Sequence, residues 1–169
     1  QSLWTGDTQI ERQRRAALLN AMREAPMHGL PAAQYDAGAL MTKLRAARTD
    51  RDRGILDVEM SRIFVELARD MQTGVLTPSR IDPAIVREVP YRNRASYLAN
   101  FARSTPNAFF RALTPQTNEY VQLLKAKMEL DNKIAHGGWG RTVNASSLKP
   151  GQSGAQVVAL RDRLIAMGY

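Results

Sequence analysis

The sequence contains no cysteine. A chain without this residue forms no disulfide, supplies no thiolate nucleophile and binds no metal through sulfur. It also has no apolar run close to the ~20 residues that a membrane-spanning helix needs. Aromatic residues make up only 7% of the chain and do not alternate with basic residues, so no base-stacking platform is expected. These features exclude thiol chemistry and a transmembrane helix within the residues given.

The chain carries positive charge, most of it as arginine. The formal net charge is +8 and the sequence pI is about 10.3. This balance suits an anionic partner: nucleic acid, a lipid headgroup surface or an acidic wall polymer. With 169 residues, the chain has room for one domain, or for one domain and part of a second. It starts with Gln1 rather than Met, so we expect a trimmed N-terminus with any export signal already removed.

Local signals in the first half of the chain predict helices. Thr8 and Glu11 form a T-x-x-E capping box, which predicts a helix that Pro26 stops. Gly29 is suited to a turn with positive φ. Asp36 is the predicted N-cap of a second helix, whose apolar stripe consists of Leu40, Leu44 and Ala47.

The strongest helical pattern follows a charged stretch. We expect "RTDRDRG" (48–54) to be a loop and Asp57 to cap the helix after it. Gly74 is the predicted C-terminal stop. The buried face of this helix is expected to comprise Met60, Ile63, Phe64, Leu67 and Met71.

The second half has shorter elements and more proline. A connector, "VLTPSRIDP" (75–83), leads to short helices predicted over residues 85–88, 94–102 and 107–113. Thr114-Pro115 predicts the start of a longer helix that ends at "HGGWG". A short strand is expected over 139–143. A last helix has a predicted capping box at Ser153 and Gln156, ends at Gly168, and should dock its apolar stripe on the scaffold or on a second copy.

No known catalytic or metal-binding motif is recognisable. "GQSGA" has its glycines at the wrong offsets for a serine nucleophile elbow. His28 and His136 have no predicted triad partner and are interpreted as loop residues. "HGGWG" lacks the Lys and Ser/Thr of a phosphate loop. The acids near 50–59 alternate in part with arginine, which favours a salt-bridged loop over a cation site; they are Asp50, Asp52, Asp57 and Glu59.

Three glutamates are candidates for the general acid of a helical muramidase: Glu59, Glu66 and Glu119. Glu59 and Glu66 lie beside an apolar stripe on a helix whose polar face needs charges in any case, so a structural role is favoured. Trp139 is interpreted as a core anchor or as a contact to a neighbouring domain.

The order of the segments resembles the helical scaffold region of the large Gram-negative murein L,D-transpeptidases. The matching stretches are "ALLNAMREAPMHGLPAAQY", "ILDVEMSRIFVELARDMQTGVLTPSRID", "ALTPQTNEYVQLLKAKME" and "GGWGRTV". The chain departs from the family at its glycine-to-proline element, where Val75 stands in place of Arg or Lys. It also lacks the family's Ser-His-Gly-Cys-type catalytic motif, so no catalytic residue carries over.

The C-terminal stretch from Leu148 to Tyr169 resembles the first helix of a peptidoglycan-binding module. Gly151 and Gly154 fit the turn of that pattern and Gly168 fits its exit. The rest of such a module is not in the sequence given. The resemblance therefore implies two regions: a scaffold domain over 1–143 and an incomplete wall-binding module over 144–169.

The expected fold is all-α, an irregular multi-helix scaffold bundle with a short β element near 139–143. The resemblance implies a non-catalytic scaffold in the periplasm, with peptidoglycan and a missing catalytic domain as partners and an anionic envelope surface as a further one. No cofactor, metal or catalytic residue is expected, and the wall-contacting residues are not identified. The alternatives are a free-standing muramidase or lytic transglycosylase and a basic nucleic-acid-binding domain.

Overall fold

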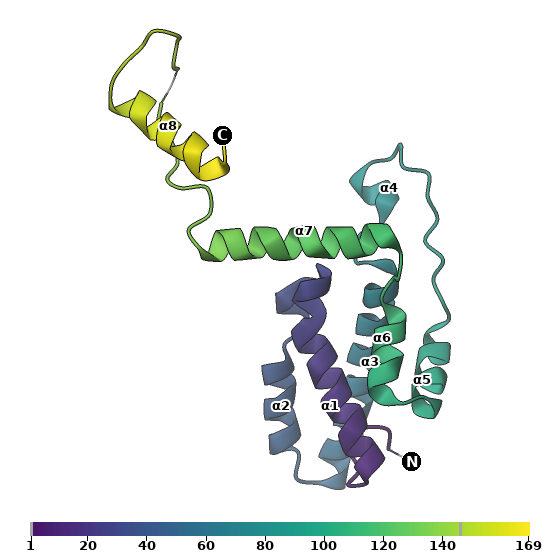
Figure 1. Ribbon diagram of the computed structural model, residues 1–169. Helices are drawn as coiled ribbons and strands as arrows, with labels where there is room; N and C mark the ends of the chain where they lie inside the picture. Colours follow the sequence, from purple (N-terminus) through teal and green to yellow (C-terminus); the bar gives the residue numbers. More distant parts are fainter. Residues whose placement is uncertain (1, 146) are drawn as a thin grey trace. The chain divides into compact units, whose positions relative to one another are not determined.

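The computed structural model describes residues 2–145 and 147–169 as helices joined by turns and irregular segments (Figure 1). The chain divides into two units, Gln1–Gln116 and Thr117–Tyr169, each with its own internal contacts. The first contains α1 (Gln9–Glu24), η1 (Ala25–His28), η2 (Ala32–Gln34), α2 (Ala37–Ala46), α3 (Asp50–Thr73), α4 (Pro78–Ile81), α5 (Arg94–Arg103) and α6 (Pro106–Leu113). The second contains α7 (Asn118–Ala135) and α8 (Ala155–Met167).

Several helix ends lie where the local signals predict them. The capping box of Thr8 and Glu11 starts α1, and the Asp36 carboxylate accepts the Ala39 backbone N–H at the start of α2. Gly29 and Gly74 both have positive φ, at 78° and 79°, at the ends of η1 and α3. These predictions are confirmed because a cap depends on residues within one helical turn.

The start of α3 differs from the prediction. Residues 50–54 are helical rather than a loop, and Thr49 is the N-cap, with Asp52 completing a capping box. The prediction that Asp57 caps this helix is therefore wrong. A Thr-x-x-Asp pattern makes the same reciprocal pair of hydrogen bonds as Thr-x-x-Glu, and it lies inside the stretch expected to be loop.

The core of the first unit is built around a cluster of aromatic rings. Trp4 and Phe101 stack with ring centroids 5.2 Å apart, and Phe64 lies 4.5 Å from Phe101. All three are fully buried. Phe110 contacts Phe64 and Phe101 edge-on, and Phe109 contacts Phe101 in the same way. Such pairs stabilise a fold beyond their area burial. The rings come from α3, α5, α6 and the N-terminal segment, so the cluster joins parts of the chain that are far apart in sequence.

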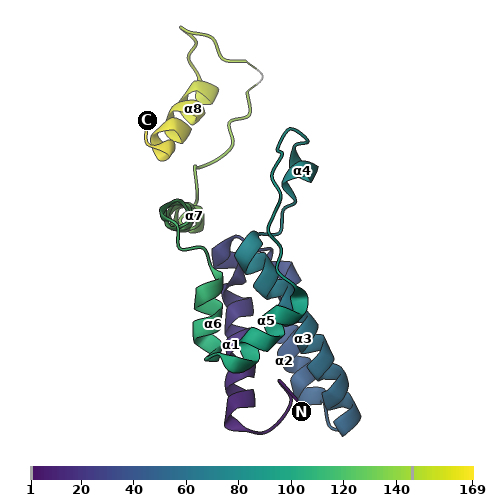
Figure 2. The ribbon, with the colours of Figure 1, turned by 90° about the vertical axis from the view of Figure 1, so that its right-hand side faces the viewer.

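The helices of the first unit pack directly against one another around this cluster. Within the first unit α1 contacts α2 and α6, and α3 contacts α2, α5 and α6. In Figures 1 and 2 these helices lie side by side. The expected buried face of α3 is confirmed, with Met60, Phe64, Leu67 and Met71 buried and Ile63 partly buried. A face of this kind at 3.6-residue spacing is what allows α3 to lie at the centre of the unit.

A long segment from Val75 to Asn93 extends away from the other helices of the first unit, with the four-residue α4 as its only helix (Figure 2). The helix predicted over 85–88 is wrong, because these residues are irregular. The stretch lies between Pro83 and Pro90 and is too short to compensate for the cost of nucleating a helix.

The helix start predicted at Thr114-Pro115 is wrong. Thr114 ends α6, and α7 begins at Asn118 with Thr117 as its N-cap. The end of α7 before His136 agrees with the prediction. No described residue of α7 is buried, although it carries large apolar residues that include Leu123 and Met128.

The predicted β element at 139–143 is not found, since these residues form turns and irregular backbone. Gly137, Gly138 and Gly140 all have positive φ, and an isolated extended segment has no neighbouring strand with which to pair. The Trp139 side chain makes a cation–π contact with Lys133 of α7, whose ammonium nitrogen lies 5.4 Å from the ring centroid.

The N-terminus of α8 also differs from the predicted capping box. Gly154, with φ of 131°, is the N-cap, and no side chain caps the helix. The Gln156 side chain donates to the Asn144 carbonyl instead, and Arg163 donates to the Arg141 carbonyl. Gly168 ends the helix in a left-handed conformation, as expected. Docking of α8 on the scaffold or on a second copy stays a prediction.

Candidate functional site

The glutamates considered as catalytic acids lie in ion pairs or on the surface. Glu59 pairs with Lys43 of α2, and Glu66 pairs with Arg62 one turn earlier on α3. Glu119 is exposed in the first turn of α7. A general acid needs an apolar environment that raises its pKa, and Glu59 and Glu66 have cationic neighbours instead. This favours the structural interpretation of Glu59 and Glu66.

The two histidines lie at helix ends. His28 ends η1 and lines a groove together with Glu24 and Arg111. Burial lowers the pKa of His28, and the negative charge of Glu24 offsets part of that decrease. His136 is the C-cap of α7, with Nδ1 2.8 Å from the Asn132 carbonyl oxygen. Within residues 2–145 and 147–169, no group of three or more acidic or histidine side chains is placed to hold a metal ion.

A different site emerges from the tertiary structure, which we call the arginine groove. It lies between α1, α2 and α3, has a volume of about 410 Å³, and falls within the usual size range of small-ligand sites. Four arginines line it, with Asp7 as the single acidic residue among the lining side chains. The arginines are Arg12, Arg15, Arg45 and Arg53. Apolar side chains complete the lining, chiefly Leu19, Met41, Leu44 and Leu56.

Three of these arginines hold the N-terminal segment in place. The Arg12 guanidinium donates to the Asp7 carbonyl, and Arg15 donates to the carbonyls of Trp4 and Gly6 at 2.5 and 2.6 Å. Arg53 lies 3.7 Å from the Asp7 carboxylate. Arg12 and Arg15 share one face of α1 because they are three residues apart. Each guanidinium has five N–H donors, so these contacts leave donors available at the groove.

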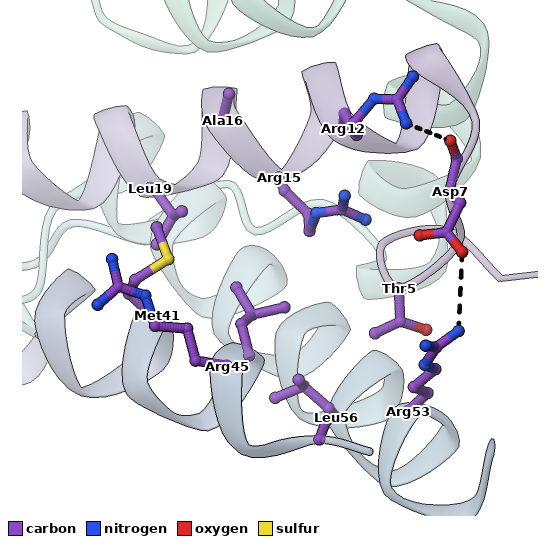
Figure 3. A pocket seen from close by; sticks show the side chains of 12 residues that line it. Thr5, Asp7, Arg12, Arg15, Ala16, Leu19, Met41, Arg45, Arg53 and Leu56 are labelled. Atoms are coloured by element: carbon purple, nitrogen blue, oxygen red, sulfur yellow. Dashed lines mark hydrogen bonds and ion pairs between the residues drawn. The ribbon is translucent and has the colours of Figure 1, made fainter. Parts of the chain in front are cut away.

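Arg45 differs from the other three. It is exposed on α2, and its guanidinium makes no hydrogen bond or ion pair with any other residue that the structure describes. Figure 3 shows it at one end of the groove beside Met41 and Leu19, with Arg53 and Asp7 at the other end. An unpaired guanidinium at this position can bind a carboxylate or phosphate through two parallel hydrogen bonds.

The floor of the groove is apolar and firmly held. Leu19 is 5% exposed and Leu56 is 4% exposed, and both belong to the hydrophobic core of the unit. Met41 and Leu44 are partly buried and pack against that core. The groove thus combines cationic side chains at its rim with an apolar base, a combination suited to a ligand that has both anionic and aliphatic groups.

The arginine groove is not identifiable from the sequence. The arginines are scattered along the chain, and their meeting depends on the packing of three helices. One signal is available locally: Arg12 and Arg15 lie on one face of a helix whose start is predicted correctly. Nothing local, however, brings Arg45 and Arg53 to that face.

The described helices include none that is both long and apolar enough to cross a membrane. A family model described as a scaffold domain matches residues 1–126, which include the whole first unit and the arginine groove. No curated protein and no solved structure matches the chain. The family match spans well over half of the 169 residues, and the chain therefore belongs to the Scaffold domain family.

Proposed function

We propose that this chain is the non-catalytic scaffold of a periplasmic L,D-transpeptidase that cross-links peptidoglycan peptide stems. The observation that carries the proposal is the scaffold-domain match over residues 1–126, taken with the order of segments that resembles this enzyme family. The reaction is an acyl transfer between peptide stems through a cysteine thioester, and the thiolate is supplied by a catalytic domain outside this chain.

The physical role of the scaffold is to hold other modules at fixed positions. The aromatic pairs in the core of the first unit stabilise it beyond their area burial, which suits a domain with this role. We propose that residues 144–169 begin a wall-binding module, with Val157, Leu160 and Leu164 of α8 as the core stripe that the rest of the module covers. The net charge of +8 favours the anionic cell envelope.

The reading frame that follows the codon for Tyr169 provides the most direct test of this proposal. We expect it to continue into the remainder of a three-helix module and to encode a Cys-His catalytic motif in the same polypeptide. A gene product that contains no such motif would contradict the assignment to a transpeptidase.

A second test measures activity of the chain on purified peptidoglycan. Incubated alone with sacculi, the chain should release no soluble glycan. Glycan release that is lost in Glu59→Gln would instead support a muramidase. Glu129→Gln provides the control, because this acid is exposed on α7 and is not one of the three candidate acids. Sub-micromolar, salt-dependent binding to duplex DNA would favour the nucleic-acid-binding alternative.

A further inference from the structure

We infer that the arginine groove binds a short acidic peptide, with carboxylates at the rim and an aliphatic side chain on the apolar floor. The inference rests on the residues that line the groove and does not depend on the enzyme to which the domain belongs. It extends the proposed scaffold role by giving the first unit a ligand of its own.

The rim of the groove is strongly cationic. The lining contains four guanidinium groups and one carboxylate, so it carries an excess of three positive charges. Asp7 is already engaged with Arg53, and Arg45 has no partner among the described side chains. A planar guanidinium matches a carboxylate in geometry, which makes carboxylates natural ligands here.

The positions of the charges define the shape of the ligand. Arg45 lies at one end of the groove, whereas Arg53 lies at the other, with Arg15 between them (Figure 3). Two carboxylates separated along an extended backbone would reach both ends. Between them, Leu19, Met41 and Leu56 form the base on which a branched aliphatic side chain can be buried.

The same geometry disfavours two other classes of anionic partner, nucleic acids and lipid bilayers. No aromatic side chain lines the groove, so nucleic-acid bases would have no surface on which to stack. Membrane-surface sites present apolar side chains outermost, where they insert among the lipid headgroups. Here Leu19 and Leu56 are buried beneath the arginines, so a flat bilayer would meet the charges without reaching the apolar floor.

The test is a ¹⁵N NMR titration of the full chain with the peptide acetyl-Glu-Leu-Glu-amide. We expect saturable shifts of the amide signals of Leu19, Leu44, Arg45 and Leu56. Replacing both glutamates of the peptide by glutamine should weaken binding about tenfold or more, and replacing its leucine by serine should weaken it several-fold.

Two variants of the chain, each with a matched control, localise the interaction. Arg45→Gln should weaken binding of the acidic peptide about threefold to tenfold, because it removes the unpaired guanidinium. Arg48→Gln, which makes the same change on an exposed residue outside the groove, should leave it within about twofold. Ala16→Leu should block the groove, since Ala16 is exposed in its lining, while Ala39→Leu on the exposed surface of α2 should not.

Three results would overturn the inference. One is no saturable binding of the acidic peptide to the wild-type chain. Another is equal loss of binding in Arg45→Gln and Arg48→Gln, which would indicate a diffuse charge effect. The third is binding of phosphatidylglycerol vesicles that displaces the peptide and depends on Arg45, which would assign the groove to a membrane surface. The folded state of each variant is checked by the dispersion of the same NMR spectra.

Discussion

The Asp57 carboxylate accepts the backbone N–H of Trp4 at 2.8 Å, although the two residues lie 53 positions apart in the chain. Oδ1 of Asp57 also accepts the Ser2 hydroxyl at 2.6 Å and the Thr5 N–H at 3.1 Å, while Oδ2 accepts the Leu3 N–H at 3.3 Å. One side chain of α3 thus satisfies three consecutive backbone donors of the N-terminal segment. This arrangement places the Trp4 ring in the aromatic core, where its indole N–H donates to Ser61.

Asp57→Asn should destabilise the fold. The amide can present only one acceptor oxygen, and its NH₂ group would face backbone N–H donors. The expected decrease in the free energy of unfolding is about 1–3 kcal/mol. Urea unfolding followed by circular dichroism measures it. Asp50→Asn, on the exposed first turn of the same helix, is the matched control, and an equal decrease in that variant would indicate a general effect of charge on α3.

Stability should fall as the solution becomes acidic, in part through Asp57. Partial burial raises the pKa of Asp57, but hydrogen bonds from Ser2 and from the backbone of Trp4, Leu3 and Thr5 outweigh it and leave the pKa lowered. A lowered pKa stabilises the folded state above the ordinary value of about 3.9 and loses that contribution as pH falls through the folded value.

The urea midpoint of the wild-type chain should therefore decrease between about pH 5 and pH 3. Asp57→Asn should show a shallower decrease over the same interval, because the variant lacks one of the linked protons. Parallel curves for the two chains would show that this carboxylate does not contribute to the acid dependence. The pKa of Glu11 is also lowered, chiefly by hydrogen bonds from the hydroxyl and backbone N–H of Thr8. We expect Glu11 to cause part of the decrease in stability that remains in Asp57→Asn.

Two glycine-to-alanine substitutions should have opposite effects. A Cβ on Gly6 would fall on the Glu11 carboxylate, which accepts the Thr8 N–H at 2.9 Å in the capping box of α1. Gly6→Ala should therefore displace that carboxylate and lower the melting temperature. Gly54 lies within α3 with open space where a Cβ would project, so Gly54→Ala should raise the free energy of unfolding by about 0.5–1 kcal/mol. Thermal unfolding measures the change in melting temperature of each variant, and changes of the same sign would contradict the prediction.

Tyr35→Phe should weaken the contact between η2 and α3. The Tyr35 hydroxyl donates to Oδ2 of Asp70 at 2.6 Å, and Asp70 is only 2% exposed. Gln34 and Arg69 also contact this carboxylate, so the loss should be about 1–3 kcal/mol rather than complete unfolding. Urea unfolding at neutral pH measures the change. Tyr91→Phe is the control, because the Tyr91 side chain is 54% exposed.

The same tyrosine should be visible in alkaline titration. Burial, followed by the hydrogen bond and charge of Asp70, raises the pKa of Tyr35 far above its ordinary value. A raised pKa stabilises the folded state below about pH 10, and this contribution is lost as pH rises further. Absorbance of tyrosinate should show one fewer late-ionising group in Tyr35→Phe. If Tyr35 instead ionises with the exposed tyrosines, the variant will lose absorbance from the early phase and keep the late phase unchanged.

Helix starts and stops that depend on neighbouring residues are largely predictable. Thr8 with Glu11, Asp36 before α2 and Gly74 after α3 are all identified correctly, since each cap is completed within one turn of its own helix. The errors at Thr49, Thr117 and Gly154 arise where the sequence offers more than one residue that can cap the helix, or where a glycine is the N-cap without a side chain.

The sequence by itself determined a predominantly helical chain, its principal helices, the amphipathic face of α3 and a positive charge. Only the tertiary structure decided that Asp57 holds the N-terminal segment rather than capping a helix, and that Arg45 meets Arg12, Arg15 and Arg53 around one groove. The physical reason is the range of the interactions. Capping and periodicity act over a few residues, whereas the partners of the Asp57 carboxylate and the meeting of four arginines depend on which helices pack together, and the packing of side chains decides that.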